Sequence, residues 1–131
     1  MNNSKQKIKI LIVEDEAITG IYVKNMLKRR GYIVTSLETS GESAVLSAGA
    51  DKPDLVLMDI KLSGVMDGID AAKYILDKFS IPVIFLTAQS NSAIFEKLNT
   101  NKPFECLFKP YTERELDKII SDTLNKIKPN E

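Results

Sequence analysis

The chain has 131 residues, the size of one ordinary globular domain, and its 18 basic and 18 acidic residues give a formal net charge of zero. This balance gives no electrostatic case for binding nucleic acid, and no apolar stretch approaches the ~20 residues of a membrane span. With one cysteine and no histidine, the sequence excludes an internal disulfide, histidine metal ligands and a phosphorylated histidine. We therefore expect a soluble cytoplasmic protein with one domain over 8–127 and tails at 1–7 and 128–131.

Short apolar stretches alternate with segments of helical periodicity along the whole chain. The apolar stretches predict strands over 9–13, 32–37, 54–58, 82–86 and 105–108. Between and after them, apolar spacing predicts helices over 17–30, 69–79, 90–99 and 113–126, and another helix is expected to open at 39–42 and to reach about residue 50. Two T-x-x-E sequences, at Thr39 and Thr112, have the form of capping boxes, and Gly31 is placed to end the first helix.

Five successive strand–helix units predict an α/β fold with a parallel sheet. Strands three and four are almost wholly apolar, as expected for strands covered on both faces. Right-handed crossovers then give a doubly wound three-layer sandwich of five strands and five helices, in the flavodoxin-like order 2-1-3-4-5. In that order, ligands bind at the carboxyl ends of strands one and three.

Charged and hydroxyl side chains follow the predicted strands at that edge of the sheet. Glu14 and Asp15 follow strand one, Asp59 follows strand three, Thr87 ends strand four and Lys109 ends strand five. Three carboxylates in one crevice repel one another unless a cation lies among them. Because the available ligands are oxygens, we expect a hard divalent ion, Mg²⁺.

A carboxylate beside Mg²⁺, a hydroxyl and an ammonium group is also suited to phosphoryl transfer. Asp59 can act as the nucleophile and become an aspartyl phosphate. Lys109 and Mg²⁺ would neutralise charge on the transferring group, and Thr87 would donate its hydroxyl to a phosphoryl oxygen.

Four sequence blocks, taken together, resemble the signature of two-component response-regulator receiver domains. They are ILIVEDE over 10–16, LVLMDIKL over 55–62, LTA over 86–88 and KP over 109–110. Their order and spacing agree with that family over 8–126. The resemblance implies that Asp59 is the phosphoacceptor, that Asp15 binds the metal directly, that Glu14 binds it through water, and that the Lys61 backbone carbonyl is a further ligand.

The resemblance also implies how the domain would switch. Thr87 corresponds to the switch hydroxyl and Lys109 to the family's invariant lysine, whose bond to Pro110 is typically cis. Cys106 departs from the family pattern, because an aromatic residue usually stands at that switch position. The implied partner is a histidine kinase or a phosphotransfer protein.

Phosphorylation in this family is self-catalysed, so the domain is not a conventional enzyme. It signals through a face formed by the fourth helix, fifth strand and fifth helix to a downstream protein or fused output domain. We expect a monomer, or a weak dimer through that face, and no contact with nucleic acid or membrane.

Other interpretations of the same residues stay open. Taken alone, Glu14 and Asp15 could be solvated acids of a loop, and Asp59 could cap a turn. A pseudo-receiver would keep the fold as an interaction module without phosphate chemistry. A Mg²⁺-dependent aspartyl-phosphate hydrolase is disfavoured. Such enzymes typically carry a D-x-D motif whose second Asp acts as acid and base, whereas the residue two positions after Asp59 is Lys61. A flavin site is disfavoured because the acids would repel its phosphate.

Overall fold

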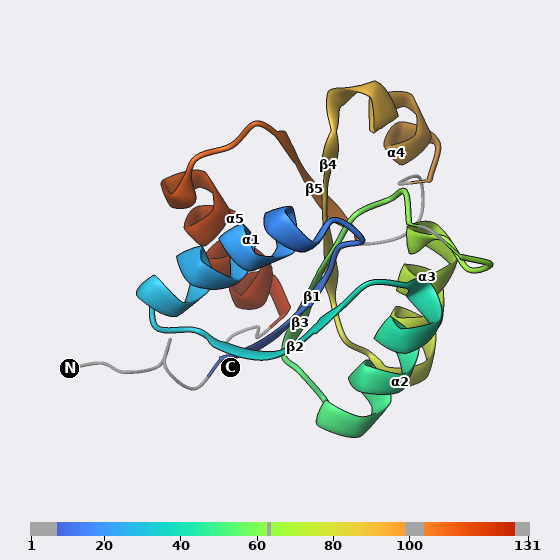
Figure 1. The fold of residues 1–131 in the computed structure, drawn as a ribbon, viewed down its shortest axis with the longest axis horizontal. Helices are drawn as coiled ribbons and strands as arrows, with labels where there is room; N and C mark the ends of the chain where they lie inside the picture. The colour runs from blue at the N-terminus through green and yellow to red at the C-terminus, as the bar shows by residue number, and fades with distance from the viewer. Residues whose placement is uncertain (1–7, 63, 99–103, 128–131) are drawn as a thin grey trace.

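The structure is a computed structural model that describes residues 8–62, 64–98 and 104–127 (Figure 1). Its strands are β1 (Lys9–Val13), β2 (Ile33–Glu38), β3 (Leu55–Met58), β4 (Val83–Ala88) and β5 (Glu105–Lys109). Its helices are α1 (Ala17–Arg29), α2 (Gly41–Asp51), α3 (Gly68–Phe79), the 3₁₀ turn η2 (Gln89–Asn91), α4 (Ser92–Leu98) and α5 (Glu113–Ile127). The predicted tails at 1–7 and 128–131 lie outside the described residues.

All neighbouring strands pair in parallel, in the order β2-β1-β3-β4-β5, which confirms the predicted sheet. Helices α1 and α5 lie together on one side of the sheet, and α2, α3 and α4 lie on the other (Figure 1). The predicted three-layer α/β sandwich is therefore present. Within the described residues, no helix is long and apolar enough to cross a membrane.

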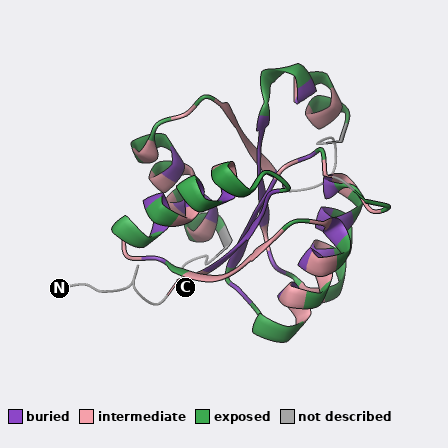
Figure 2. Ribbon diagram, in the orientation of Figure 1, coloured by how far each residue is buried: buried purple, intermediate pink, exposed green. Residues whose placement is uncertain are grey.

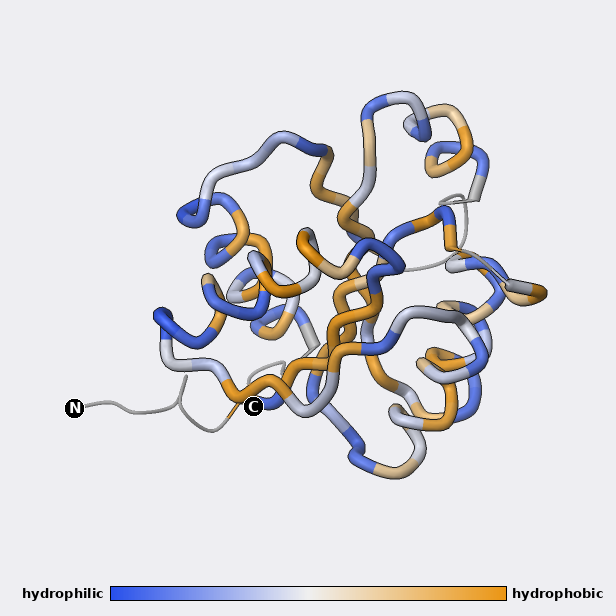
Figure 3. The backbone as a smooth tube through the Cα atoms, viewed as in Figure 1, coloured by the Kyte–Doolittle hydropathy of each residue, from blue (hydrophilic) through white to orange (hydrophobic). Residues whose placement is uncertain are grey.

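Alternate residues of the central strands pack into two separate cores. Leu11 and Val13 of β1 face α2 and α3, whereas Ile10 and Ile12 face α1 and α5. The same alternation continues through β3 and β4, so the middle of the sheet is buried on both faces (Figure 2). Colouring by hydropathy shows the same strands as the most apolar part of the chain (Figure 3).

The start of α2 differs from the prediction by one residue. Ser40, not Thr39, is the N-cap: its backbone is extended and its hydroxyl accepts from Ser43 N at 3.1 Å. Glu42 instead accepts a hydrogen bond from Met66 N at 3.2 Å. The second predicted box is confirmed, because Thr112 and Glu115 exchange hydrogen bonds of 2.9 and 3.0 Å at the start of α5.

Two helices also differ from the apolar pattern. On α1, Ile18 and Tyr22 fall at helical apolar spacing, yet they are 84% and 60% exposed, whereas Val23 contacts the core. The fourth helix was predicted over 90–99. The η2 turn precedes α4, which begins at Ser92, and residue 99 lies outside the described residues.

Candidate functional site

The carboxyl ends of four strands surround one pocket. Parallel pairing aligns β1 with β3, and Asp59 N donates to Val13 O at 3.2 Å just beyond the paired residues. The pocket has a volume of about 410 Å³ and is lined by Asp15, Glu16, Asp59, Lys61, Ala88, Asn91 and Lys109. Four of the predicted site residues therefore lie around one space, although the sequence separates them widely.

Asp59 is half-buried, and three groups contact or approach its carboxylate. The Thr87 hydroxyl donates to Oδ1 at 2.7 Å, and the main-chain N–H of Lys61 donates to the same oxygen at 3.3 Å. The ammonium group of Lys109 lies 3.6 Å from Oδ2. The side chain of Asp59 retains 14% exposure toward the pocket, so a phosphodonor can reach a carboxylate that protein groups already orient.

Lys109 lies between two carboxylates from different strands. Its Nζ is 3.4 Å from Glu14 Oε1 and 3.6 Å from Asp59 Oδ2, and its peptide bond to Pro110 is cis, as the family resemblance implies. Glu14 is buried. Burial raises the pKa of the Glu14 carboxyl, whereas the Lys109 charge and a hydrogen bond from Glu16 N oppose that rise. Lys109 is thus the counter-ion for the buried acid and for Asp59.

The described side chains around the pocket are suited to a magnesium ion that keeps most of its waters, and they do not form a site in which protein groups supply all the ligands. Within 8–62, 64–98 and 104–127, no three His, Cys, Asp or Glu side chains form a cluster that could hold a metal. Asp15 is exposed and lines the pocket with Asp59, whereas Glu14 lies behind them against Lys109. Mg²⁺ keeps several waters and needs only one or two carboxylates, which is the donor set that Asp15 and Asp59 offer.

Asn91 also belongs to the site, although the sequence does not predict it. Its side-chain amide donates to Thr87 Oγ1 at 2.7 Å, and the residue is only 8% exposed. No motif marks Asn91. The only signal was that Asn91 follows Thr87 by four residues, in the turn between β4 and α4.

Gly68 explains why the loop after β3 returns so close to the site. A Cβ atom at this position would lie 2.0 Å from the main-chain oxygen of Asp59 and 2.8 Å from that of Ile60. Gly68 N also donates to Ile60 O at 3.0 Å. Only glycine permits this approach of α3 to the main chain of Asp59.

Cys106 faces α4 from the middle of β5. It is half-buried, and burial, with a smaller effect of the Asp59 charge, raises the pKa of its thiol to about 12. It packs beside a group of aromatic rings in which Phe85 lies 5.5 Å from Phe104 and Phe95 lies 6.4 Å from Phe108, measured between ring centroids. Aromatic contacts to α4 therefore exist, but they come from neighbours of Cys106.

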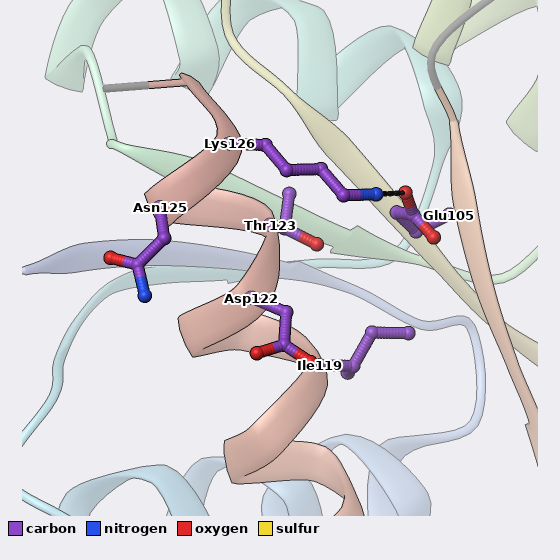
Figure 4. A pocket seen from close by; sticks show the side chains of 6 residues that line it. All are labelled: Glu105, Ile119, Asp122, Thr123, Asn125 and Lys126. Carbon is purple, nitrogen blue, oxygen red and sulfur yellow. Dashed lines mark hydrogen bonds and ion pairs between the residues drawn. The ribbon is translucent and has the colours of Figure 1, made fainter. Parts of the chain in front are cut away.

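A second cavity, of about 470 Å³, lies between β5 and α5 and includes none of the predicted site residues (Figure 4). Lys126 and Glu105 form an ion pair of 2.6 Å at its edge. Thr123 lines it with 5% exposure, and the Thr123 hydroxyl has no hydrogen-bond partner among the described residues. A buried hydroxyl without a partner costs stability.

Comparison with known proteins identifies the family. The model for the response regulator receiver domain matches residues 10–121. The transcriptional regulatory protein PdtaR of Mycobacterium tuberculosis is 34% identical over 120 residues, covering 92% of this chain and 58% of PdtaR. The phyllosphere-induced regulator PhyR of Methylorubrum extorquens is 29% identical over 116 residues, covering 88% of this chain and 43% of PhyR. The chain thus spans about half the length of these relatives.

Similar solved structures support the same family assignment. The signal receiver domain of a modulated diguanylate cyclase from Desulfovibrio desulfuricans has a TM-score of 0.86 and 32% identity, covering 94% of this chain and 98% of that one. The N-terminal domain of a response regulator/sensory box/GGDEF protein from Carboxydothermus hydrogenoformans has a TM-score of 0.82 and 36% identity, covering 92% and 96%. Domains of this family are generally non-enzymatic signalling domains that interact with histidine kinases or phosphotransfer proteins. With its sheet order, its strand-end residues and these matches in agreement, the chain belongs to the response regulator receiver domain family.

Proposed function

We propose that Asp59 accepts a phosphoryl group from a histidine kinase or phosphotransfer protein, in a Mg²⁺-dependent reaction. The observation that carries the proposal is the Asp59 carboxylate in an open pocket, with the Thr87 hydroxyl at 2.7 Å and the Lys109 ammonium at 3.6 Å. These 131 residues contain no histidine, so a phosphohistidine donor would lie outside them.

The transfer forms one bond and breaks one. A carboxylate oxygen of Asp59 attacks the phosphorus atom, and the bond between phosphorus and the donor imidazole nitrogen breaks, leaving its electron pair on that nitrogen. Lys109 balances negative charge on the phosphoryl oxygens, and the Thr87 hydroxyl can move its hydrogen bond from Asp59 to one of them. Bound Mg²⁺, on Asp15, Asp59 and the Lys61 carbonyl, would supply further charge neutralisation.

Small phosphodonors provide a direct test. We expect acetyl phosphate with Mg²⁺ to add one phosphoryl group to the wild-type protein, detected by intact mass and removed by hydroxylamine. Asp59→Asn should abolish the addition. Asp51→Asn is the matched control, because Asp51 is an exposed carboxylate at the end of α2, away from the pocket, and it should label normally. Equal labelling of Asp59→Asn would refute the assignment.

The metal roles can be tested separately. Because Asp15 lines the pocket and Glu14 is paired with Lys109, Asp15→Ala should weaken Mg²⁺ binding more than Glu14→Ala does. Binding to the folded state alone also predicts that Mg²⁺ raises the thermal midpoint of the wild-type protein. Equal losses in a metal titration, or a midpoint that ignores millimolar Mg²⁺, would contradict these roles.

The signal would leave through the face formed by α4, β5 and α5, as the family resemblance implies. This face includes the aromatic contact of Phe95 with Phe108. Its downstream partner, a monomeric or weakly dimeric state and a cytoplasmic location stay predictions. Cys106 favours one competing function, a pseudo-receiver that does not switch. In that case beryllofluoride, a phosphoryl mimic, would leave the NMR shifts of α4 unchanged in the presence of Mg²⁺.

A further inference from the structure

The side chain of Asn91 begins a chain of two hydrogen bonds that passes through the Thr87 hydroxyl and ends at the Asp59 carboxylate. Asn91 Nδ2 lies 2.7 Å from Thr87 Oγ1, and Thr87 Oγ1 lies 2.7 Å from Asp59 Oδ1. Asn91 is 8% exposed, and Thr87 is buried as well. Such a short, buried chain fixes the positions of all three groups.

The chemistry of the three groups sets the direction of this chain. An ionised carboxylate only accepts, so the single hydroxyl proton of Thr87 is directed at Asp59. The hydroxyl oxygen can then only accept from Asn91, which requires the amide nitrogen of Asn91 to face it. Asn91 therefore prevents the Thr87 proton from turning away from the pocket.

The same side chain connects the pocket to a helix. Asn91 is the last residue of η2, and α4 starts at the next residue, Ser92. Thr87 lies near the end of β4, on the sheet. A displacement of the Thr87 hydroxyl would therefore act directly on the first turn of α4, without passing through the residue at position 106.

We propose that Asn91 is a positioning residue for phosphoryl transfer to Asp59. It keeps the Thr87 proton directed at the reacting carboxylate and makes the start of α4 follow the Thr87 hydroxyl. The inference rests on the proposed role of Asp59 as phosphoacceptor. In this proposal the hydrogen bond from Asn91 to Thr87 couples the pocket to α4. The aromatic residue that is usual at position 106, here Cys106, is not needed for this coupling.

Three variants test the positioning role through the initial rate of labelling by acetyl phosphate. Asn91→Asp keeps the shape but replaces the donor with an acceptor that competes for the Thr87 proton, so we expect a rate about tenfold lower. Asn91→Ala only removes the donor to the Thr87 hydroxyl, so we expect a labelling rate about threefold lower than that of wild type. Ser90→Ala is the control, because Ser90 is an exposed residue of the same turn, and its rate should match that of wild type. Wild-type rates in both Asn91 variants would overturn the inference.

A second measurement separates positioning from simple loss of structure. With Mg²⁺ and beryllofluoride, the amide NMR signals of 92–98 should shift in wild type and in Ser90→Ala. In Asn91→Ala the mimic should still bind, seen at the amides around Asp59, while the α4 shifts shrink severalfold. If the amide signals of α4 shift as far in Asn91→Ala as in wild type, the proposed coupling of the pocket to α4 through Asn91 is wrong.

Failure of the proposed function is distinguishable from failure of this inference. If wild type takes no phosphoryl group, the phosphoacceptor assignment is wrong. The Asn91 bond is tested independently in the untreated protein, where the Thr87 hydroxyl proton should give an exchange-protected NMR signal that Asn91→Ala removes. A missing signal in wild type would overturn the role of Asn91 by itself.

Discussion

Helices α5 and α4 flank the same edge of the sheet but are attached to the rest of the molecule in different ways. The start of α5 is bound to the end of α1 and the residues just after it by directional polar contacts. Glu113 pairs with Arg29 at 2.8 Å and with Arg30 at 2.9 Å, and Asp117 accepts from Tyr32 Oη at 2.6 Å. Helix α4 packs on the sheet through ring contacts, with Phe95 lying 6.2 Å from Phe85.

This difference teaches which helix can respond to the pocket. None of the residues that form these bonds lines the pocket around Asp59, so a change at the pocket does not act on them directly. Ring contacts are less directional than hydrogen bonds, which weaken steeply as their angle departs from linear. The hydrogen bond from Asn91 to Thr87 is therefore the contact at the start of α4 that depends on the state of the site.

The largest expected effect comes from removing the ring that supports α4. Phe85 is fully buried between Phe95 and Phe104, so Phe85→Ala should lower the free energy of unfolding by about 3–5 kcal/mol, measured by urea denaturation. Hydrogen exchange should accelerate most in α4. Leu86→Ala, on the opposite face of β4, is the control, and its exchange should accelerate in α1 and α5 instead. The same exchange pattern in both variants would break the comparison.

The polar attachment of α5 predicts a smaller loss. Tyr32 is buried and its hydroxyl donates to Asp117, so Tyr32→Phe should lower the free energy of unfolding by about 1–2 kcal/mol. Tyr22→Phe is the matched control, because Tyr22 is exposed on α1 and its substitution should change stability by less than about 0.5 kcal/mol. Equal effects in urea denaturation would show that the hydroxyl contact contributes nothing.

Two threonines of the α5 region should respond with opposite signs. The buried Thr123 hydroxyl has no partner among the described residues, so Thr123→Val should raise the free energy of unfolding by about 1 kcal/mol. Thr112 caps the helix by accepting from Glu115 N, so Thr112→Val should lower it by about 1 kcal/mol. Thermal or urea unfolding measures both, and destabilisation by Thr123→Val would mean that its hydroxyl is satisfied.

The smallest expected effect is a pH dependence at the junction of α1 and α5. Hydrogen bonds from Arg29 and Arg30 hold the pKa of the Glu113 carboxyl below its ordinary value of 4.5. Their stabilisation is therefore complete above that ordinary value and disappears as pH falls through the lowered pKa. Glu113→Gln should be slightly less stable than wild type at neutral pH and equal to it in strong acid. A difference that persists in acid would assign the effect to packing.

The sequence predicted the sheet and most of the site for a specific reason. Each apolar stretch ends at a polar residue, and parallel topology brings those ends to one edge, so the sequence alone predicts that Asp15, Asp59 and Lys109 lie around one pocket. The sequence does not predict Asn91, because a side chain that acts through Thr87 carries no motif of its own.

The exposure of part of α1 also escaped prediction, for a different reason. Helical periodicity marks apolar residues but not which of them face the sheet, so Ile18 and Tyr22 were indistinguishable from Val23. The N-cap of α2 was misplaced because two hydroxyl residues, Thr39 and Ser40, are adjacent. The choice between them depends on the path of the chain out of β2, which the local pattern does not contain.

The close approach of Gly68 has a consequence for how the domain would register its own modification. With the first residue of α3 close against the carbonyl oxygen of Asp59, the backbone beneath the proposed phosphoacceptor has little room to move toward α3. New charge and volume on the carboxylate therefore cannot be accommodated by retreat of that wall. The opposite wall, built from β4 and the turn that follows it, is the side that must yield.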